Sequence, residues 1–219
     1  FSTETIPMTQ LLQHLQWRYA AKKMDPTKVV PADKVERILE AARLAPSSSG
    51  LQPYEVIVIT NPTLRAQLRA AANNQAQVTD GSHLLVFAAW DHYTPERIHR
   101  FFDLTIEMRG GTNEGWESYR QSLLAKLPAR EPRINFEHAA RQAYIAFTAS
   151  LIAAACEEVD CTPMEGFDPV EVDRILKLPE KGLKSVAIMP LGYRLSGEDW
   201  LEKLAKVRRP REEFVTEVN

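Results

Sequence analysis

Apolar side chains recur at helical spacing most clearly over residues 33–45. They occupy positions i, i+3, i+4 and i+7 of this segment: Val35, Ile38, Leu39 and Ala42. This period places them on one face of an amphipathic helix. Asp33 and Glu36 have the spacing of a capping box, and Pro46 ends the pattern. The sequence therefore predicts a helix over residues 33–45 that is capped by Asp33.

Further helices are predicted from apolar spacing or from capping residues. They cover residues 9–20, 62–72 and 137–159 and a segment that starts at Asp168-Pro169. Asn61-Pro62 and Asp168-Pro169 each combine an N-cap residue with a proline at the first helical position. The segment 137–159 is apolar on nearly every face between Ala143 and Ala155. Such a helix belongs in the middle of a protein or at a large interface.

Short runs rich in β-branched residues predict the strands. Three runs are nearly continuous in apolar character, as strands covered on both faces are: residues 54–60, 84–91 and 185–193. The alternation FVTEV over residues 214–218 predicts an edge strand. Because strands are few and alternate with helices only in part, the predicted fold class is α+β, with helices around a small sheet in one domain over residues 1–219.

Charge and composition argue against several classes of protein. The 219 residues carry 27 basic and 29 acidic side chains, whereas nucleic-acid-binding proteins are usually strongly basic. No apolar run reaches the roughly 20 residues that a bilayer crossing requires, and the first residues do not resemble a signal peptide. The two cysteines, Cys156 and Cys161, form no disulfide framework and are expected to be buried. We therefore expect a cytoplasmic protein that binds neither nucleic acid nor membrane.

The motifs of several familiar catalytic sites are absent from the sequence. It has neither GxGxxG after a predicted strand nor GxxxxGK[ST], the glycine-rich loops that bind phosphates. HExxH, GxSxG and CxxC are also absent, and the histidines are not at metal-ligand spacings. The pattern of residues thus indicates neither a metal site nor a nucleophilic side chain.

Four segments hold residues suited to a flat or anionic ligand, although they lie far apart in the sequence. Arg18 and Lys22 place two cations near a predicted helix end, and residues 206–211 (KVRRPR) add further charge. Residues 45–53 supply small hydroxyl side chains, and residues 162–168 form a loop whose backbone N–H groups can face a ligand. Taken singly, each segment is more readily explained as a solvated helix end, a basic turn or a connecting loop.

Taken together, these segments resemble the bacterial oxygen-insensitive NAD(P)H nitroreductase family, some of whose members are described as dihydropteridine or flavin reductases. The similarity follows the chain in order from about residue 10 to residue 218. Its motifs are Arg18-x-x-x-Lys22, PSSSGLQP from Pro46, Asn74-Gln75-x-Gln77-Val78, Pro163-x-Glu165-Gly166-Phe167-Asp168 and the K-x-R-x-P tail that ends in TEV. The resemblance implies an α+β nitroreductase-like fold with a small mixed or antiparallel central sheet. It also implies a homodimer that exchanges its C-terminal strands.

FMN bound non-covalently at the subunit interface is the cofactor that the resemblance implies. The residues implied at the phosphate and ribityl end are Arg18, Tyr19, Ala20, Lys206 and Arg208. Those implied at the N1/O2 edge of the ring are Lys22, Asn74 and Gln77. The partner subunit would contribute Pro46, Ser47 and Ser48, and Gly50 of the same loop is also implied as a cofactor-binding residue. Backbone donors near N5 and O4 would come from Glu165 and Gly166, with Pro163 and Met164 packed against the ring.

The chain departs from the family pattern at three of these positions. Gly50 stands where asparagine is frequent, Ala20 where serine is common, and Gln77 where a lysine can occur. Residues 92–130 are the part least like the family, in which this region helps to cover the active site. For its rings, Phe101, Phe102, Trp116 and Tyr119, packing between helices is the competing explanation.

The reaction that the resemblance implies is a two-electron, ping-pong transfer. NAD(P)H delivers a hydride to FMN and leaves, and a nitroaromatic or quinone acceptor then takes its place. The chemistry is on the flavin, so neither a catalytic side chain nor a metal is implied. Alternatives are a flavin reductase, an enone reductase or a dehalogenase of the same fold, or a flavin-binding module without turnover.

Overall fold

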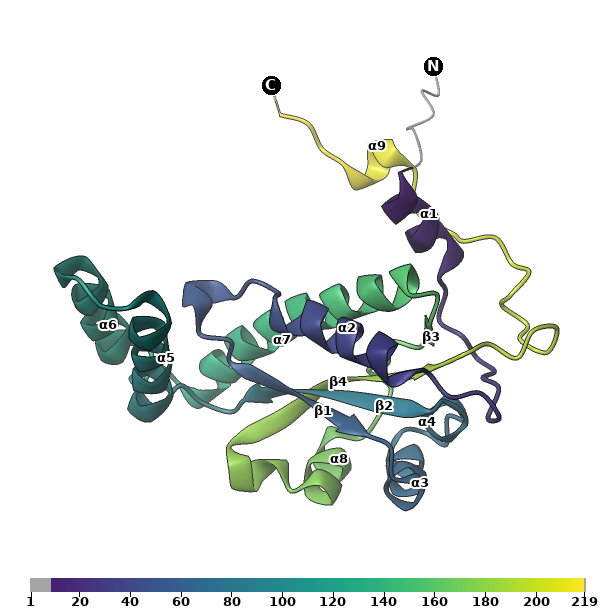
Figure 1. The fold of residues 1–219 in the computed structure, drawn as a ribbon, viewed down its shortest axis with the longest axis horizontal. Helices are drawn as coiled ribbons and strands as arrows, with labels where there is room; N and C mark the ends of the chain where they lie inside the picture. The colour runs from purple at the N-terminus through teal and green to yellow at the C-terminus, as the bar shows by residue number, and fades with distance from the viewer. Residues whose placement is uncertain (1–8, 219) are drawn as a thin grey trace.

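Four strands form one antiparallel sheet in the computed structural model, which describes residues 9–218 (Figure 1). The strands are β1 (Tyr54–Ile59), β2 (His83–Trp90), β3 (Asp160–Cys161) and β4 (Leu183–Gly192), in the order β1-β2-β4-β3. β2 pairs with β1 on one side and with β4 on the other. Residues 84–89 of β2 are all buried, which explains the continuous apolar run of this strand.

Helices cover both faces of the sheet. α2 (Ala32–Arg43) and α7 (Pro132–Cys156) lie on one face, and α3 (Pro62–Ala71) and α8 (Pro169–Leu176) lie on the other, where the short α4 (Gln77–Asp80) follows α3 (Figure 1). Phe87 of β2 points into the first core, against Phe147 of α7, and Val86 points into the second. Successive residues of the central strand thus serve two separate cores.

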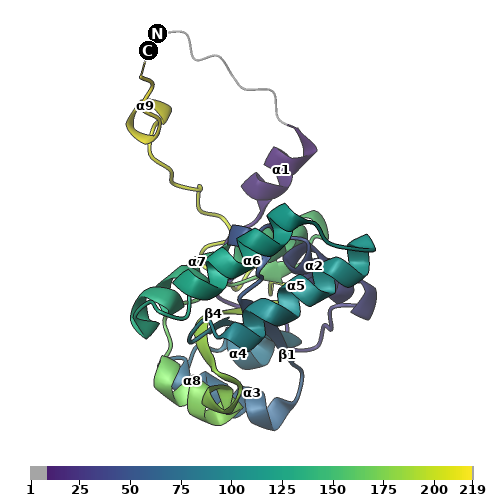
Figure 2. The same ribbon diagram turned by 90° about the vertical axis from the view of Figure 1, so that its left-hand side faces the viewer.

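A helical hairpin projects from one end of the molecule. α5 (Pro95–Arg109) and α6 (Glu114–Lys126) form it, beside the first turns of α7 (Figures 1 and 2). The Asn113 side chain caps α6 by accepting the N–H of Trp116 at 2.9 Å. The rings of Phe102 and Trp116 lie 4.6 Å apart between the two helices. Aromatic packing, together with the ion pair of Arg120 on α6 with Asp103 on α5 at 2.9 Å, therefore holds the hairpin together.

The two ends of the described chain extend from the body on one side. α1 (Gln10–Trp17) and α9 (Arg211–Phe214) both stand above the sheet and its helices in the two views (Figures 1 and 2). Phe214 is 71% exposed. An exposed ring at the end of an extended arm is a feature that a second molecule can cover.

The capping residues predicted two helix starts correctly. Asn61 accepts the N–H of Leu64 at 2.9 Å at the start of α3, and Asp168 accepts the N–H of Val170 at 2.9 Å at the start of α8. The cap predicted for α2 is wrong, because Pro31 occupies the N-cap position. Asp33 lies in the first turn of α2, where it forms an ion pair with Arg37 at 3.0 Å.

Three other expectations need correction. The predicted helix over residues 137–159 begins earlier, at Pro132, and ends at Cys156. Within this chain the FVTEV segment is not a strand, because Phe214 ends α9 and residues 215–218 pair with no strand. Cys161 is buried as expected, but Cys156 is exposed at the end of α7.

α7 is the one helix among residues 9–218 whose length and composition would allow it to cross a membrane. Its buried residues, among them Ala146 and Phe147, pack against α2 and the sheet. A core helix of this kind passes the same test of length and hydropathy, so the test alone is weak support for a membrane span.

Candidate functional site

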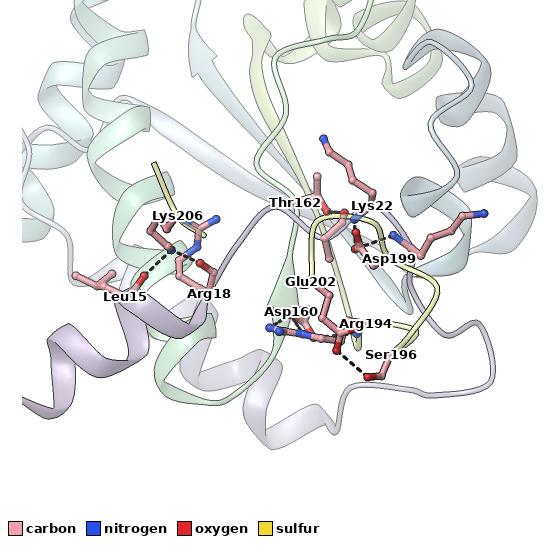
Figure 3. A network of polar contacts seen from close by, with 12 residues as sticks. Leu15, Arg18, Lys22, Asp160, Thr162, Arg194, Ser196, Asp199, Glu202 and Lys206 are labelled. Carbon is pink, nitrogen blue, oxygen red and sulfur yellow. Dashed lines mark hydrogen bonds and ion pairs between the residues drawn. The ribbon is translucent and has the colours of Figure 1, made fainter. Parts of the chain in front are cut away.

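Cations from the two ends of the chain meet beside one cavity. Its volume is about 600 Å³, and Arg18, Lys206 and Arg208 all line it. Tyr19 and Ala20 line the same cavity, which we call the cation cavity. The Lys206 ammonium donates to the carbonyl oxygen of Leu15 at 2.8 Å and to that of Arg18 (Figure 3). The predicted convergence of Arg18 with the C-terminal basic segment is therefore seen in the structure.

Three of the four basic side chains that line the cation cavity have no ion pair within the described chain, although Glu202 also lines the cavity. Arg18, Lys206 and Arg208 form no ion pair with residues 9–218. The Nε of Arg18 is buried and has no hydrogen-bond partner there. Burial, and then the charges of Arg18 and Arg208, lower the pKa of Lys206. A buried guanidinium nitrogen without a partner is unfavourable, so this donor set, with half-buried Lys206 and exposed Arg208 beside Arg18, fits an anion such as a phosphate.

Arg194 fixes the chain on both sides of Arg18. Its guanidinium lies between the rings of Trp17 and Tyr19, 4.4 and 4.5 Å from their centres. Arg194 also binds the buried carboxylate of Asp160, with Nη2 2.6 Å from Oδ1. The predicted ligand residue Tyr19 thus packs on Arg194, and burial raises its pKa. Ala20 is held next to β3 by its bridge with Cys161.

The loop at residues 163–166 offers two adjacent backbone donors. Met164 exchanges hydrogen bonds with Ile188 of β4 at 2.9 and 3.0 Å. The carbonyl oxygen of Gly166 accepts from the side-chain amides of Asn73 and Gln75, each at 3.0 Å. The N–H groups of Glu165 and Gly166 have no acceptor among residues 9–218. The loop is therefore anchored through its carbonyls, which leaves these donors available to a ligand.

Two residues of α7 hold the loops on which the prediction depends. The Tyr144 hydroxyl donates to the Glu165 carboxylate. The Gln142 side-chain oxygen accepts the N–H of Ser48 at 2.8 Å. Burial, followed by the hydrogen bond and charge of Glu165, raises the pKa of Tyr144. Neither α7 residue belonged to a motif recognised in the sequence.

The structure explains why a glycine occupies position 50. Gly50 has a φ of +70°, and a Cβ atom there would lie 2.9 Å from Cζ of Phe101 on α5. A larger residue would therefore need both a left-handed backbone and a displaced ring. The hydroxyl of Tyr119 on α6 donates to Ser49 Oγ at 2.6 Å. The 46–50 loop is thus attached to the α5–α6 hairpin.

Not all of the predicted residues meet at the cation cavity. None of residues 46–50 lines it, and neither do Lys22, Asn74, Gln77 or residues 163–166. Gln77 is only 5% exposed, in the first turn of α4. Asn74 has a φ of +55°, and its neighbours Asn73 and Gln75 make the side-chain contacts with the 163–166 loop instead.

Comparison with known proteins gives a consistent result. The model of the nitroreductase family matches residues 15–193. YfkO of Bacillus subtilis, named as an NAD(P)H nitroreductase, is 34% identical over 200 residues, which span 85% of this chain and 90% of that protein. The major NAD(P)H-flavin oxidoreductase of Aliivibrio fischeri is 30% identical over 216 residues, or 94% of this chain and 97% of the relative.

Solved structures agree on the fold. A nitroreductase-type protein of Exiguobacterium sibiricum, crystallised in complex with FMN, superimposes with a TM-score of 0.80 at 17% identity. The superposition covers 98% of this chain and 100% of that one. This chain belongs to the nitroreductase family. The resemblance seen in its motifs, and the oxidoreductase class and α+β fold that the resemblance implied, are confirmed.

Proposed function

We propose that this protein is a cytoplasmic, FMN-dependent oxidoreductase that uses NAD(P)H to reduce nitroaromatic or quinone acceptors. The observation that carries the proposal is the cation cavity, where Arg18 Nε is buried without a partner beside Lys206 and Arg208. A phosphate satisfies these donors. The flavin activity in the name of the Aliivibrio fischeri relative, and the FMN in the Exiguobacterium sibiricum complex, support FMN as the bearer of that phosphate.

Each part of the site has a distinct binding role in this proposal. Arg18, Lys206 and Arg208 bind the phosphate, and the Glu165 and Gly166 N–H groups donate to acceptor atoms of the ring. Lys22 supplies positive charge at the ring edge, where it stabilises electron uptake. When bound, FMN accepts two electrons from NAD(P)H and passes them to the acceptor. The buried Cys161 takes no part as a nucleophile, because burial raises its pKa to about 12.

Spectroscopy and steady-state kinetics test this proposal. The protein, reconstituted with FMN and desalted, is expected to keep the visible flavin bands and to lose them on anaerobic addition of NADH or NADPH. Initial rates with a nitrofuran, menadione, free FMN, an enone and an iodinated phenol then rank the acceptors. No retained flavin would contradict the proposal. Turnover with free FMN, the enone or the iodinated phenol alone would replace the nitroaromatic or quinone assignment.

We further propose a homodimer in which each C-terminal arm lies on the partner. β1 is an edge strand and borders a cavity of about 660 Å³ between α2 and α5. Its apolar lining includes Val56, Phe101 and Leu104, and four cations also line it: Arg43, Arg97, Arg100 and Lys181. The segment REEFVTEV, residues 211–218, combines acidic and apolar side chains that complement this lining.

The dimer also accounts for the position of the 46–50 loop. This loop does not line the cation cavity of its own chain. A second molecule can place it on the partner's ligand, as the family resemblance implies. Truncation after Arg209 is expected to convert a dimer to a monomer in light-scattering chromatography, with Lys206 and Arg208 retained. A monomeric full-length chain, or a truncated chain that dimerises equally tightly, would contradict this arrangement.

A further inference from the structure

A buried carboxylate without a cation lies beside the cation cavity. Asp199 is 5% exposed and forms no ion pair with any residue in the 9–218 range. Its Oδ2 accepts the N–H of Lys22 at 2.6 Å (Figure 3). The same oxygen accepts the N–H of Lys23 at 3.2 Å, and Oδ1 accepts the N–H of Leu201 at 2.9 Å. Three backbone N–H groups therefore satisfy this charge.

These hydrogen bonds connect the two parts of the chain that carry the predicted ligand cations. On one side, residues 22–25 run beside residues 193–195, with Leu195 N–H donating to the Lys23 carbonyl at 3.0 Å. On the other side, the segment that starts at Asp199 continues to Lys206 and Arg208, which line the cation cavity. Asp199 thus joins the Lys22 segment to the segment that bears the phosphate-binding cations.

The environment of Asp199 keeps it ionised. Burial raises the pKa of its carboxyl, but the backbone N–H groups of Leu201, Lys22 and Lys23, followed by the Tyr19 hydroxyl, outweigh burial. The pKa of Asp199 therefore lies below its usual value. The side chain of Lys22, in contrast, makes no hydrogen bond or ion pair with residues 9–218. The main chain of Lys22 is held, and its ammonium group remains available to a ligand.

We propose that Asp199 is a positioning residue of the flavin site, which fixes Lys22 and the start of the Lys206–Arg208 segment in the arrangement that binds FMN. This inference rests on the proposed function. The expected effect of removing Asp199 on FMN affinity is the opposite of the effect that net charge alone predicts. Removing a negative charge near a cluster of cations strengthens phosphate binding by simple electrostatics. Removing the residue that positions those cations weakens it.

The sign of the change in FMN affinity decides between these two effects. Asp199→Asn removes the charge and replaces one acceptor oxygen with an NH₂ group, and we expect the Kd for FMN to rise about tenfold or more. Glu198→Gln removes the same charge one residue away, where the side chain is exposed and accepts no hydrogen bond within the described chain. Its Kd is expected to stay equal to that of the wild type or to fall.

Asp199→Glu provides the second variant, because it keeps the charge but moves the carboxylate by one methylene. We expect weaker FMN binding here too. Amide hydrogen exchange, measured without ligand, should accelerate at Lys22 and Lys23 in both Asp199 variants but not in Glu198→Gln. Unchanged or tighter FMN binding in the two Asp199 variants, or an equal loss in Glu198→Gln, would overturn the inference.

A redox measurement tests whether Asp199 acts through Lys22. Lys22→Met and Asp199→Asn should each shift the midpoint potential of bound FMN to more negative values, and Asp199→Asn should add little in the Lys22→Met background. If Asp199→Asn shifted the midpoint potential equally in the wild type and in Lys22→Met, Asp199 would not act through Lys22. If wild-type protein binds no FMN, the proposed function fails. If it binds FMN and Asp199→Asn behaves like the wild type, only the positioning role fails.

Discussion

The cation cavity and the α5–α6 hairpin differ in the sequence separation of their contacting residues and in how much aromatic packing they contain. At the cavity, segments nearly 190 residues apart are joined by polar atoms, such as the Lys206 ammonium on the carbonyls of Leu15 and Arg18. In the hairpin, residues near each other in sequence are joined by rings, with Phe102 and Trp116 4.6 Å apart. Polar contacts predominate in the first region, whereas the second combines ring packing with an ion pair between Arg120 and Asp103 at 2.9 Å. Substitutions should therefore damage the two regions in different ways.

The largest expected effect comes from removing the guanidinium of Arg18, whose Nε is buried at the cavity. Arg18→Met should weaken FMN binding by about 3 kcal/mol, or more than 100-fold, because a charged hydrogen-bond donor to the phosphate is lost. Arg209→Met is the matched control, since Arg209 is exposed and stacks on Phe214. Fluorescence titration with FMN measures both. Equal losses in the two variants would mean that the cavity does not bind the phosphate.

The hairpin should respond to a change of shape rather than of charge. Gly50→Ala is expected to lower the free energy of unfolding by about 2–3 kcal/mol, because it combines a left-handed backbone with overlap of the Phe101 ring. In a Phe101→Ala background the overlap is removed, and the cost should fall to about 1 kcal/mol. Urea denaturation of the four proteins of this cycle measures the coupling. A cost that is the same in both backgrounds would exclude the ring as its source.

Lys206 should give the cavity a pH dependence of its own. Burial and the neighbouring arginines lower the pKa of Lys206, so this cation loses its proton at a lower pH than an ordinary lysine. FMN affinity should therefore fall, by about tenfold, as the pH rises through this lowered pKa. Without FMN, the free energy of unfolding should instead rise over the same pH range. The folded protein loses the proton of Lys206 at a lower pH than the unfolded chain does. Lys206→Arg should keep its FMN affinity over the same range, and an equal fall in that variant would assign the effect to another group.

The smallest effect is expected for a hydroxyl at the edge of the hairpin. Tyr119→Phe removes the hydrogen bond to Ser49 but retains the ring beside Phe102 and Trp116. The loss of unfolding free energy should be about 1 kcal/mol or less, since Tyr119 is partly exposed to water. A loss as large as that of Gly50→Ala would mean that polar contacts, not ring packing, hold the 46–50 loop to the hairpin.

Secondary-structure elements could be predicted where residues close together in the sequence determine them. The caps at Asn61 and Asp168 act within three residues of their partners, so the start of α3 and of α8 could be predicted. β3 could not be predicted, because its two residues are too few to show an alternating pattern. The alternation of FVTEV also gave a wrong prediction within one chain, because a strand needs a neighbour and residues 215–218 have none here.

For the site, the family motifs predicted the cations but not the residues that hold them. Arg18, Lys206 and Arg208 belong to recognised motifs, and they line one cavity. Asp199 lies 177 residues from Lys22 and contacts only its backbone, so neither residue type nor spacing indicates the pair. Tyr144 likewise lies in an apolar helix, where a tyrosine is expected to pack rather than to bind a loop carboxylate.

Gln142 and Tyr144 lie two positions apart on α7, and each binds a different loop of the candidate site. A helix is stiff over so short a distance, about 3 Å of rise. A small rotation or sliding of α7 therefore displaces the loops that contain Ser48 and Glu165 at the same time. If the two loops contact different flavins in a dimer, a substitution in the middle of α7 would alter both flavin sites.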